Sequence, residues 1–188
     1  MSFSFKSLFI KEVIIVSPTV YEDDRGFFEE TYKKTEFEKN GIPDRFCQDN
    51  HSFSVKGTLR GLHYQNPPHG QGKLVRCVTG RVLDVAVDIR RGSPTFGKWV
   101  IEELSQENHN MLWIPEGFAH GFIALADSNV EYKVTNEYNH GAEMGIIWNA
   151  PEIGIDWGAT SPLLSARDLL WKNLSDADIK FYYRMEGS

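Results

Sequence analysis

The strongest constraint on the fold comes from the middle of the chain, where short runs of β-branched and aromatic residues are separated by turn residues. From Leu74 to Trp148 these runs recur at roughly ten-residue intervals, divided by clusters of Gly, Pro, Asn and Ser. The regular alternation of strands and helices that builds a parallel α/β sheet does not occur here. The pattern predicts an all-β protein, built as an antiparallel sandwich or barrel.

Alternation within the runs predicts the individual strands and their faces. Apolar residues at odd positions from 85 to 89 alternate with polar or small residues at even positions from 84 to 88, which predicts one apolar and one polar face. Val78–Val82 is the expected hairpin between two strands. Short helices are expected only on the flanks, over Thr31–Asn40, after Ser165 and near Ser175. The remaining strands are expected at 99–101, 111–114, 122–125, 130–134 and 146–148.

The composition is that of a globular protein that needs no disulfide or metal to hold its core. The 188 residues are 41% hydrophobic, and the length predicts one domain over residues 1–188. A net charge of −6 argues against binding nucleic acid or an anionic membrane surface. No apolar run approaches the ~20 residues that span a bilayer. Two cysteines without a CxxC pair fit a reducing compartment, and we expect a cytoplasmic protein.

Two segments resemble the paired signature of the cupin barrel. In metal-binding cupins the first signature runs His-x-His, a short spacer, Glu and then Gly, and here His63, Gln65, Lys73 and Gly80 occupy those positions. The second signature, Pro-x-Gly-x-x-His, is present as Pro115–His120. The two motifs occur in the expected order. The resemblance implies a cupin-type double-stranded β-helix, or jelly-roll, barrel with short flanking helices.

The replacements at these positions change what the pocket can bind. Of the usual metal ligands only His63 and His120 remain, because Gln65 replaces a histidine and Lys73 replaces the carboxylate. Two imidazoles beside an ammonium make a poor cation site, since a divalent ion is repelled by a fixed positive charge at close range. The sequence therefore predicts a pocket that holds no metal and stabilises an anion.

Strand alternation also indicates which groups share the barrel interior. It places Lys73 and Tyr132 on the apolar faces of their runs, so both tips point into one cavity. Arg60 and His63 fall on opposite faces of a regular strand. Both can line the cavity only if the segment Gly57–Gly61 bulges or bends.

Around these residues the sequence resembles the dTDP-4-dehydrorhamnose 3,5-epimerase family, from about Asp23 to Asp168. The resemblance implies an enzyme without a cofactor that acts on dTDP-4-dehydro-6-deoxy-D-glucose. It would invert the two carbons that flank the ketone to give dTDP-4-dehydro-L-rhamnose, on the route to dTDP-L-rhamnose. The matching blocks are Leu59–Gln65, Pro67-Pro68, Gln71–Val75, Asp84–Asp88, Ser93–Thr95 and Pro115–Phe122.

The resemblance also implies catalytic roles. His63 matches the general base, and Asp168 matches the carboxylate that pairs with it. Lys73 matches the residue at the sugar's keto oxygen, and Tyr132 matches the acid that returns a proton from the opposite face. Each residue type suits its role. An ammonium stabilises an enolate, an imidazole titrates near neutrality and is oriented by a carboxylate, and a phenol donates a proton without adding charge.

A larger set resembles the family's substrate contacts, and its arginines are the expected partners of the diphosphate. Glu29 competes with Glu30 for one position, and Tyr138 is the rival of Tyr132. Relatives often carry a basic residue where this chain has Phe53, and a lysine where it has arginine at the last contact. The expected contacts are Arg25, Glu30, Gln48, Asp49, Asn50, Arg60, Lys73, His120, Tyr138, Glu143 and Arg167.

The sequence leaves alternatives open. A related enzyme could invert one carbon only, or move the ketone as a ketoisomerase does, because ring flipping depends on a pocket shape that residue spacing does not reveal. A protein of another class could use the same barrel to hold a metal ion through His63 and His120, or simply to bind a sugar.

Pairing with a second copy is expected from the ends of the chain. Aromatic residues gather at Phe3–Phe9 and Phe181–Tyr183, and a barrel of this kind has exposed strand edges. We expect a homodimer.

Overall fold

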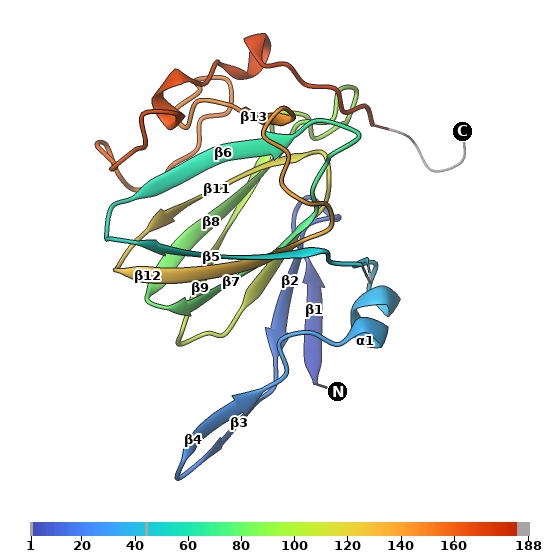
Figure 1. The fold of residues 1–188 in the computed structure, drawn as a ribbon, viewed down its shortest axis with the longest axis vertical. Coiled ribbons are helices and arrows are strands. Elements are labelled where there is room, and N and C mark those ends of the chain that lie inside the picture. The colour runs from blue at the N-terminus through green and yellow to red at the C-terminus, as the bar shows by residue number, and fades with distance from the viewer. Residues whose placement is uncertain (1, 44, 184–188) are drawn as a thin grey trace.

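Two antiparallel sheets lie face to face in the computed structural model, which describes residues 2–43 and 45–183 (Figure 1). The first sheet has the order β1 (Phe3–Ser7), β2 (Ile14–Pro18), β10 (Met111–Ile114), β7 (Lys73–Thr79), β12 (Ser128–Val134) and β5 (Gln48–Ser54). The second has the order β13 (Glu143–Gly145), β6 (Leu59–Gln65), β11 (Phe118–Ala124), β8 (Arg81–Asp88) and β9 (Trp99–Ser105). The all-β jelly-roll prediction is confirmed.

The remaining elements are short. A separate hairpin of β3 (Val20–Asp23) and β4 (Gly26–Glu29) projects away from the barrel (Figure 1). The helix predicted over Thr31–Asn40 is present as α1 (Lys34–Lys39), which buries Phe37. The two predicted C-terminal helices are single turns of 3-10 helix, η1 (Asp168–Leu170) and η2 (Leu174–Asp176).

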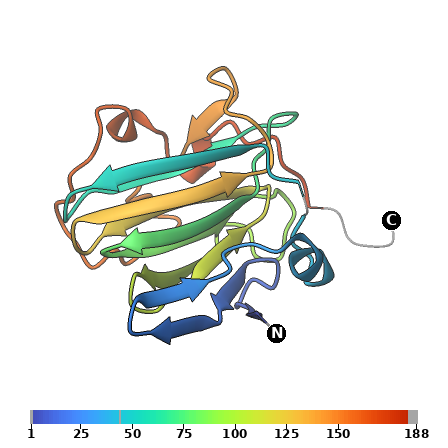
Figure 2. The ribbon, with the colours of Figure 1, turned by 60° about the horizontal axis from the view of Figure 1, so that its bottom comes forward.

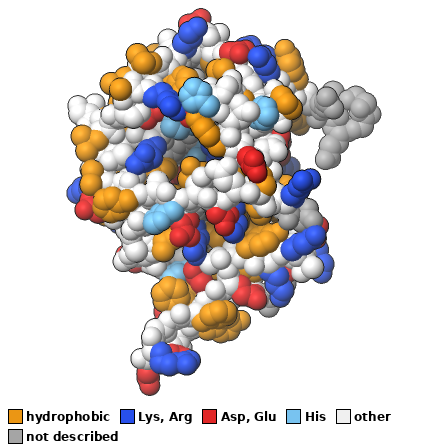
Figure 3. Space-filling model, in the orientation of Figure 1, with side chains coloured by type: hydrophobic (Ala, Val, Ile, Leu, Met, Phe, Trp, Pro, Cys, Tyr) orange, Lys and Arg blue, Asp and Glu red, His pale blue; other side chains and the backbone are white. Residues whose placement is uncertain are grey.

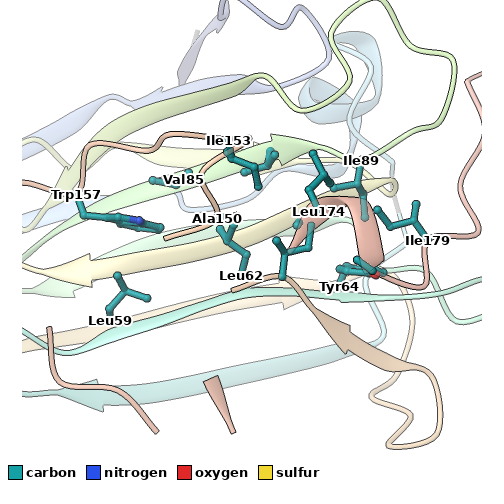
Figure 4. Close-up of a cluster of buried hydrophobic side chains, with 14 of the residues drawn as sticks. Leu59, Leu62, Tyr64, Val85, Ile89, Ala150, Ile153, Trp157, Leu174 and Ile179 are labelled. Atoms are coloured by element: carbon teal, nitrogen blue, oxygen red, sulfur yellow. The ribbon is translucent and has the colours of Figure 1, made fainter. Parts of the chain in front are cut away.

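The predicted alternation along β8 is present, but both of its faces are buried. Val82 and Ala86 point into the core between the sheets, on the same face as Asp84. Val85 and Ile89 point to the other side, where the chain after β13 covers them. Figure 4 shows this outer cluster, in which side chains of β6 and β8 pack against Ala150, Ile153, Trp157, Leu174 and Ile179.

The hairpin predicted at Val78–Val82 is wrong. Strands β7 and β8 belong to different sheets, and β7 pairs with β10 and β12 instead (Figure 2). Gly80 turns the chain from one sheet to the other with a φ of 78°, in the left-handed region that favours glycine. The turn is held by Ser128, whose Oγ accepts the Arg81 N–H at 3.0 Å. A corner between sheets and a hairpin use the same turn residues, so the local pattern did not separate them.

The last predicted strand, 146–148, is displaced toward the N-terminus. The strand β13 ends at Gly145; beyond it, Ile146 exchanges backbone hydrogen bonds with Leu62 of β6 and forms an isolated bridge with Lys172. Strands β1 to β5 lie outside the predicted series, which began further along the chain.

A bulge interrupts β6 where it pairs with β11, as the sequence required. His63 lies opposite His120 and Arg60 lies opposite Phe122, so two residues of β6 face the single residue Gly121. The strands approach closely here, since a Cβ added to Gly121 would lie 2.7 Å from the carbonyl oxygen of Arg60. Because the bulge resets the alternation, Arg60 and His63 both line the cavity between the sheets.

Among the described residues, no helix has the length and apolar character to cross a membrane.

Candidate active site

A cavity of about 660 Å³ lies between the two sheets and is lined by residues of both. Strands β5, β7 and β12 of the first sheet contribute Ser52, Lys73 and Tyr132. The second sheet and the C-terminal segment supply most of the other polar groups. Eight of the predicted site residues line the cavity, namely Arg60, His63, Lys73, His120, Tyr132, Glu143, Arg167 and Asp168.

His63 and Asp168 form a hydrogen-bonded pair at one wall of the cavity. His63 Nε2 lies 2.5 Å from Asp168 Oδ1, and the Asp168 side chain is 5% exposed whereas that of His63 is 31% exposed. Burial raises the pKa of Asp168, but the hydrogen bond and charge of His63, with bonds from Ser165 and Trp171, more than offset this and hold it below its ordinary value. The carboxylate is therefore ionised at neutral pH.

The ionised carboxylate sets the tautomer of its partner. Because Asp168 can only accept a hydrogen bond, the proton of a neutral His63 ring resides on Nε2, the nitrogen that faces it. The other nitrogen, Nδ1, keeps its lone pair. The arrangement is that of a base whose orientation is fixed by a buried carboxylate.

Lys73 reaches the same cavity from β7 and is 7% exposed. Its Nζ lies 3.5 Å from the carbonyl oxygen of His63, to which it donates. Burial lowers the pKa of Lys73 to about 8, against the charges of Asp84 and Glu143, which raise it. The side chain remains mainly an ammonium at pH 7 and places a positive charge in a water-poor space.

His120 lies across from His63 in the β11–β6 register, and its ring is bound to a second buried carboxylate. His120 Nε2 is 2.8 Å from Asp84 Oδ1, and Asp84 is completely buried. Burial, together with the charges of Lys73 and His63, lowers the pKa of His120 despite the opposing effect of Asp84. Asp84 was not among the predicted site residues, although an acid on the inward face of a buried strand was a usable signal.

Tyr132 enters the cavity from the first sheet, whereas His63 enters from the second. Its phenol is largely buried, and burial raises its pKa, with Arg60 acting in the opposite direction and Glu143 in the same one. The phenol is neutral at physiological pH and has a proton to donate.

The exposed side of the site is held by an interlinked set of polar groups. Glu143 Oε2 accepts a hydrogen bond from Tyr138 Oη at 2.7 Å and also pairs with the guanidinium of Arg167. Arg60 donates from Nε to Ser54 Oγ at 2.9 Å, which holds its guanidinium at the cavity. Gln48 Oε1 accepts the Tyr138 N–H, and Gln48 Nε2 donates to Asn50.

Comparison with known proteins identifies the family. A family profile described as dTDP-4-dehydrorhamnose 3,5-epimerase matches residues 7–176. The chain belongs to the dTDP-4-dehydrorhamnose 3,5-epimerase family. It is an isomerase of the epimerase class.

Relatives in sequence and in structure agree with this family. A dTDP-4-dehydrorhamnose 3,5-epimerase of Shigella flexneri is 54% identical over 171 residues, covering 90% of this chain and 94% of the relative. A dTDP-4-dehydrorhamnose 3-epimerase of Streptomyces niveus is 40% identical and covers 87% of this chain and 80% of the relative. The crystal structure of a Legionella pneumophila dTDP-6-deoxy-D-glucose-3,5-epimerase in complex with dTDP-4-keto-L-rhamnose superposes with a TM-score of 0.93 at 45% identity, over 97% of this chain and 100% of that one.

Six of the predicted contacts do not line the cavity of this epimerase chain, namely Arg25, Glu30, Gln48, Asp49, Asn50 and Tyr138. Arg25, at the turn of the β3–β4 hairpin, has an 89% exposed side chain and pairs with Asp23 at 2.5 Å. Asp49 is paired with Lys133 at 2.9 Å, and it alternates with Gln48 and Asn50 along β5. Glu30 does not line the cavity, and its buried Oε2 has no hydrogen-bond partner among the described residues.

The ligand set of this epimerase does not suit a metal ion. In the described part of the chain, no three or more His, Cys, Asp and Glu residues are grouped to hold one. Both cavity histidines already engage a carboxylate, His63 with Asp168 and His120 with Asp84, and the ammonium of Lys73 lies beside them. A divalent ion at this place would be repelled by that charge.

Proposed function

We propose that the chain converts dTDP-4-dehydro-6-deoxy-D-glucose into dTDP-4-dehydro-L-rhamnose by inverting both carbons that flank the ketone. The observation that carries the proposal is a base and an acid on opposite sheets of one cavity, His63 with Asp168 on one side and Tyr132 on the other, with the ammonium of Lys73 in the same space. The Legionella relative was crystallised with dTDP-4-keto-L-rhamnose, the sugar nucleotide that this reaction would form, which supports the proposal.

His63 starts each inversion by removing a proton from a carbon next to the ketone. The electron pair of the broken C–H bond moves into the ring to form an enolate, and the negative charge resides on the former keto oxygen. Lys73 stabilises that oxygen, since a fixed ammonium in a buried site needs no reorganisation when the charge appears. Asp168 stabilises the imidazolium that His63 becomes.

Tyr132 completes the inversion by donating its proton to the same carbon from the opposite face. The carbonyl reforms, and one carbon has changed configuration with one proton removed and one returned. His63 then loses its proton and the phenolate of Tyr132 regains one, both by exchange with water. The same cycle repeated at the second carbon gives the doubly inverted sugar.

The nucleotide portion is bound by the groups on the open side of the cavity. The guanidinium groups of Arg60 and Arg167 suit a diphosphate, to which arginine can donate two parallel hydrogen bonds. His120 and Glu143 line the same cavity. We extend the proposal to a single-domain, cofactor-free cytoplasmic enzyme that works as a homodimer. In such a dimer Arg25, remote from its own cavity, contacts the substrate of the second copy.

The test follows the substrate by NMR in heavy water with the purified protein. Deuterium is expected at both carbons that flank the ketone, and the product is expected to have both inverted. His63→Asn and Tyr132→Phe are each expected to slow inversion by about 10²- to 10⁴-fold, the usual contribution of a positioned base or acid. Matched controls are His51→Asn and Tyr182→Phe, which alter exposed side chains that do not line the cavity. Inversion at wild-type rates in both site variants would contradict the assignment.

A second candidate function is epimerisation at one carbon only. The observation in its favour is the Streptomyces niveus relative, named a 3-epimerase and 40% identical to this chain. The same NMR experiment separates the two, because a single-carbon enzyme leaves the second carbon with its original configuration in the released product.

A further inference from the structure

Trp171 is a side chain at the active site that none of the predicted roles includes. It follows η1 directly, and its Nε1–H donates to Asp168 Oδ1 at 3.3 Å. The same oxygen accepts the hydrogen bond from His63 Nε2 at 2.5 Å. The rings of Trp171 and His63 also meet edge to face, with centroids 6.3 Å apart and an angle of 69° between their planes. The indole therefore contacts both members of the pair.

The strand beside His63 provides the space that the indole occupies. Gly145 of β13 is the residue paired with His63 of β6, and it is buried. A Cβ added to Gly145 would lie 2.6 Å from Trp171 Nε1, a separation that real Cβ atoms essentially never show. Any larger side chain at this position would push the indole, and its N–H, away from Asp168.

Backbone contacts fix the indole against the same strand. The Ile147 N–H donates to the carbonyl oxygen of Lys172 at 2.9 Å, and Ile146 forms a bridge with Lys172. Lys172 is the neighbour of Trp171 in the chain. The position of the indole is thus tied to the strand that pairs with His63, and Asp168 is held from both sides.

We propose that Trp171 is a positioning residue for the His63–Asp168 pair and that Gly145, which lacks a side chain, provides the space for its indole. This rests on the proposed function of His63 as the base. With two donors on Oδ1, the carboxylate cannot rotate away from the imidazole while the sugar's proton is transferred. The indole also takes up part of the negative charge that attracts the imidazole proton, so the pair releases its proton to water more readily after each cycle. The pKa of Asp168, which burial raises, is brought below its ordinary value by His63, Ser165 and Trp171 together.

The first test is Trp171→Phe, which keeps an aromatic ring over Gly145 and removes only the N–H. We expect kcat to fall roughly tenfold with KM within about twofold, because the interaction matters during proton transfer. The acidic limb of the kcat/KM profile is expected to move up by about 0.5 to 1 pH unit, since the pair loses one donor that favours its deprotonated form. NMR of the imidazole nitrogens of His63, without substrate, is expected to show the same upward movement of the protonation midpoint.

The matched control is Trp99→Phe, which removes another indole N–H, one that donates to the Ile153 carbonyl oxygen at 3.0 Å in the outer cluster. It should leave the pH limb and the His63 titration unchanged. If Trp171→Phe also leaves both unchanged, the positioning role is wrong. If the wild type is active and Trp171→Phe changes neither readout, the proposed function stands and the positioning role alone is wrong. If the wild type is inactive and the His63 titration shifts in Trp171→Phe, the proposed function alone is wrong.

A second variant tests the role of Gly145. Gly145→Ala is expected to lower kcat as Trp171→Phe does, and Gly141→Ala is the control, because a Cβ there meets only Asn139 Oδ1 at 3.4 Å. In a Trp171→Ala background, Gly145→Ala should cost no further activity if it acts through the indole. A further loss in that background would overturn the role of Gly145. If Gly145→Ala fails to fold, the Trp171→Phe experiment decides the proposal by itself.

Discussion

Burying the ammonium of Lys73 in the barrel is costly, and the removal of water that causes this cost also makes the charge useful. Its pKa is lowered to about 8 because burial removes water from the charged form. The same removal of water strengthens its attraction for an oxygen that becomes negative during the reaction. Stability and catalysis therefore make opposite demands on this side chain.

Lys73→Met is expected to abolish activity and to stabilise the fold. The pKa of Lys73 in the folded state lies below its ordinary value, so below about pH 8 the folded protein contains a buried ammonium that destabilises it. Methionine has no charge, so the variant lacks this destabilisation. We expect the free energy of unfolding at pH 7 to rise by about 1–3 kcal/mol. Urea titration measures it, with Lys98→Met as the exposed control. A loss of stability in Lys73→Met alone would contradict this account.

The charge of Lys73 also predicts the alkaline limit of the activity. An ammonium is required, so kcat should fall as pH rises through about 8, where Lys73 loses its proton. Asp84 raises that pKa, and the near-isosteric Asp84→Asn removes its charge. The alkaline limb is expected to move to lower pH by roughly 0.5–1 unit in this variant. Glu131→Gln, which alters a carboxylate paired with Arg76, is the control and should leave the limb in place. An unmoved limb in Asp84→Asn would show that Asp84 does not act on Lys73.

The bulge in β6 shows how one strand presents residues of both parities to a single cavity. Arg60 and His63 would point to opposite sides of a regular strand, and the extra residue opposite Gly121 brings both to the site. Close approach of the two backbones makes the bulge possible, because Gly61 and Gly121 have no side chains to separate them.

Gly121→Ala is expected to lower both stability and activity. The added methyl would lie 2.7 Å from the Arg60 carbonyl oxygen and 3.1 Å from Gly61 Cα, so the strands must separate. We expect a loss of about 1–3 kcal/mol in the free energy of unfolding, the usual cost of overpacking a buried site. The residual activity of the folded fraction should also fall, because Arg60 and His63 move relative to each other. Urea titration and steady-state kinetics measure the two effects, and Gly141→Ala should show neither.

Alternation within a strand correctly predicted which of its side chains share a face, because that property depends on the sequence of the strand itself. Lys73 follows Val75 into the barrel, and Tyr132 follows Val130. The turn at Gly80 was misread because the partners of β7, which are β10 and β12, lie far along the chain, beyond the reach of any local pattern. The end of β13 was misplaced for the same reason, since the partners of Ile146 are Leu62 and Lys172, both distant in sequence.

The position of Asp168 depends on the fold of the whole chain. It lies 105 residues from His63 in sequence, and it reaches the cavity because the segment after β13 folds back over the outer face of β6 and β8. Periodicity carries no information about such a contact, and only the family resemblance suggested it. Asp84, which binds His120, and Trp171, which donates to Asp168, were not predicted. Their roles depend on these contacts in the folded chain and not on a sequence motif.

The projecting hairpin gives the proposed dimer a physical basis. Strands β3 and β4 leave the barrel, and Figure 3 shows hydrophobic side chains gathered on them with charged groups at the tip. Tyr21, Phe27 and Phe28 are each more than half exposed, at 56%, 61% and 65%. An apolar surface on a two-stranded ribbon, which is marginally stable alone, favours a partner that covers it.

Mixing two defective variants tests whether Arg25 serves the partner's cavity. In a dimer of Arg25→Ala with His63→Asn, the subunit that retains His63 receives an intact hairpin from the other, so one complete site forms. After the subunits are unfolded and refolded together at equal amounts, we expect about a quarter of the wild-type activity at low substrate, since half of the dimers are mixed and each has one complete site. Each variant refolded alone should remain well below this level. Light scattering should give the mass of a dimer for both. If Arg25 served the cavity of its own chain, the mixture would show no recovery, because neither subunit would then hold a complete site.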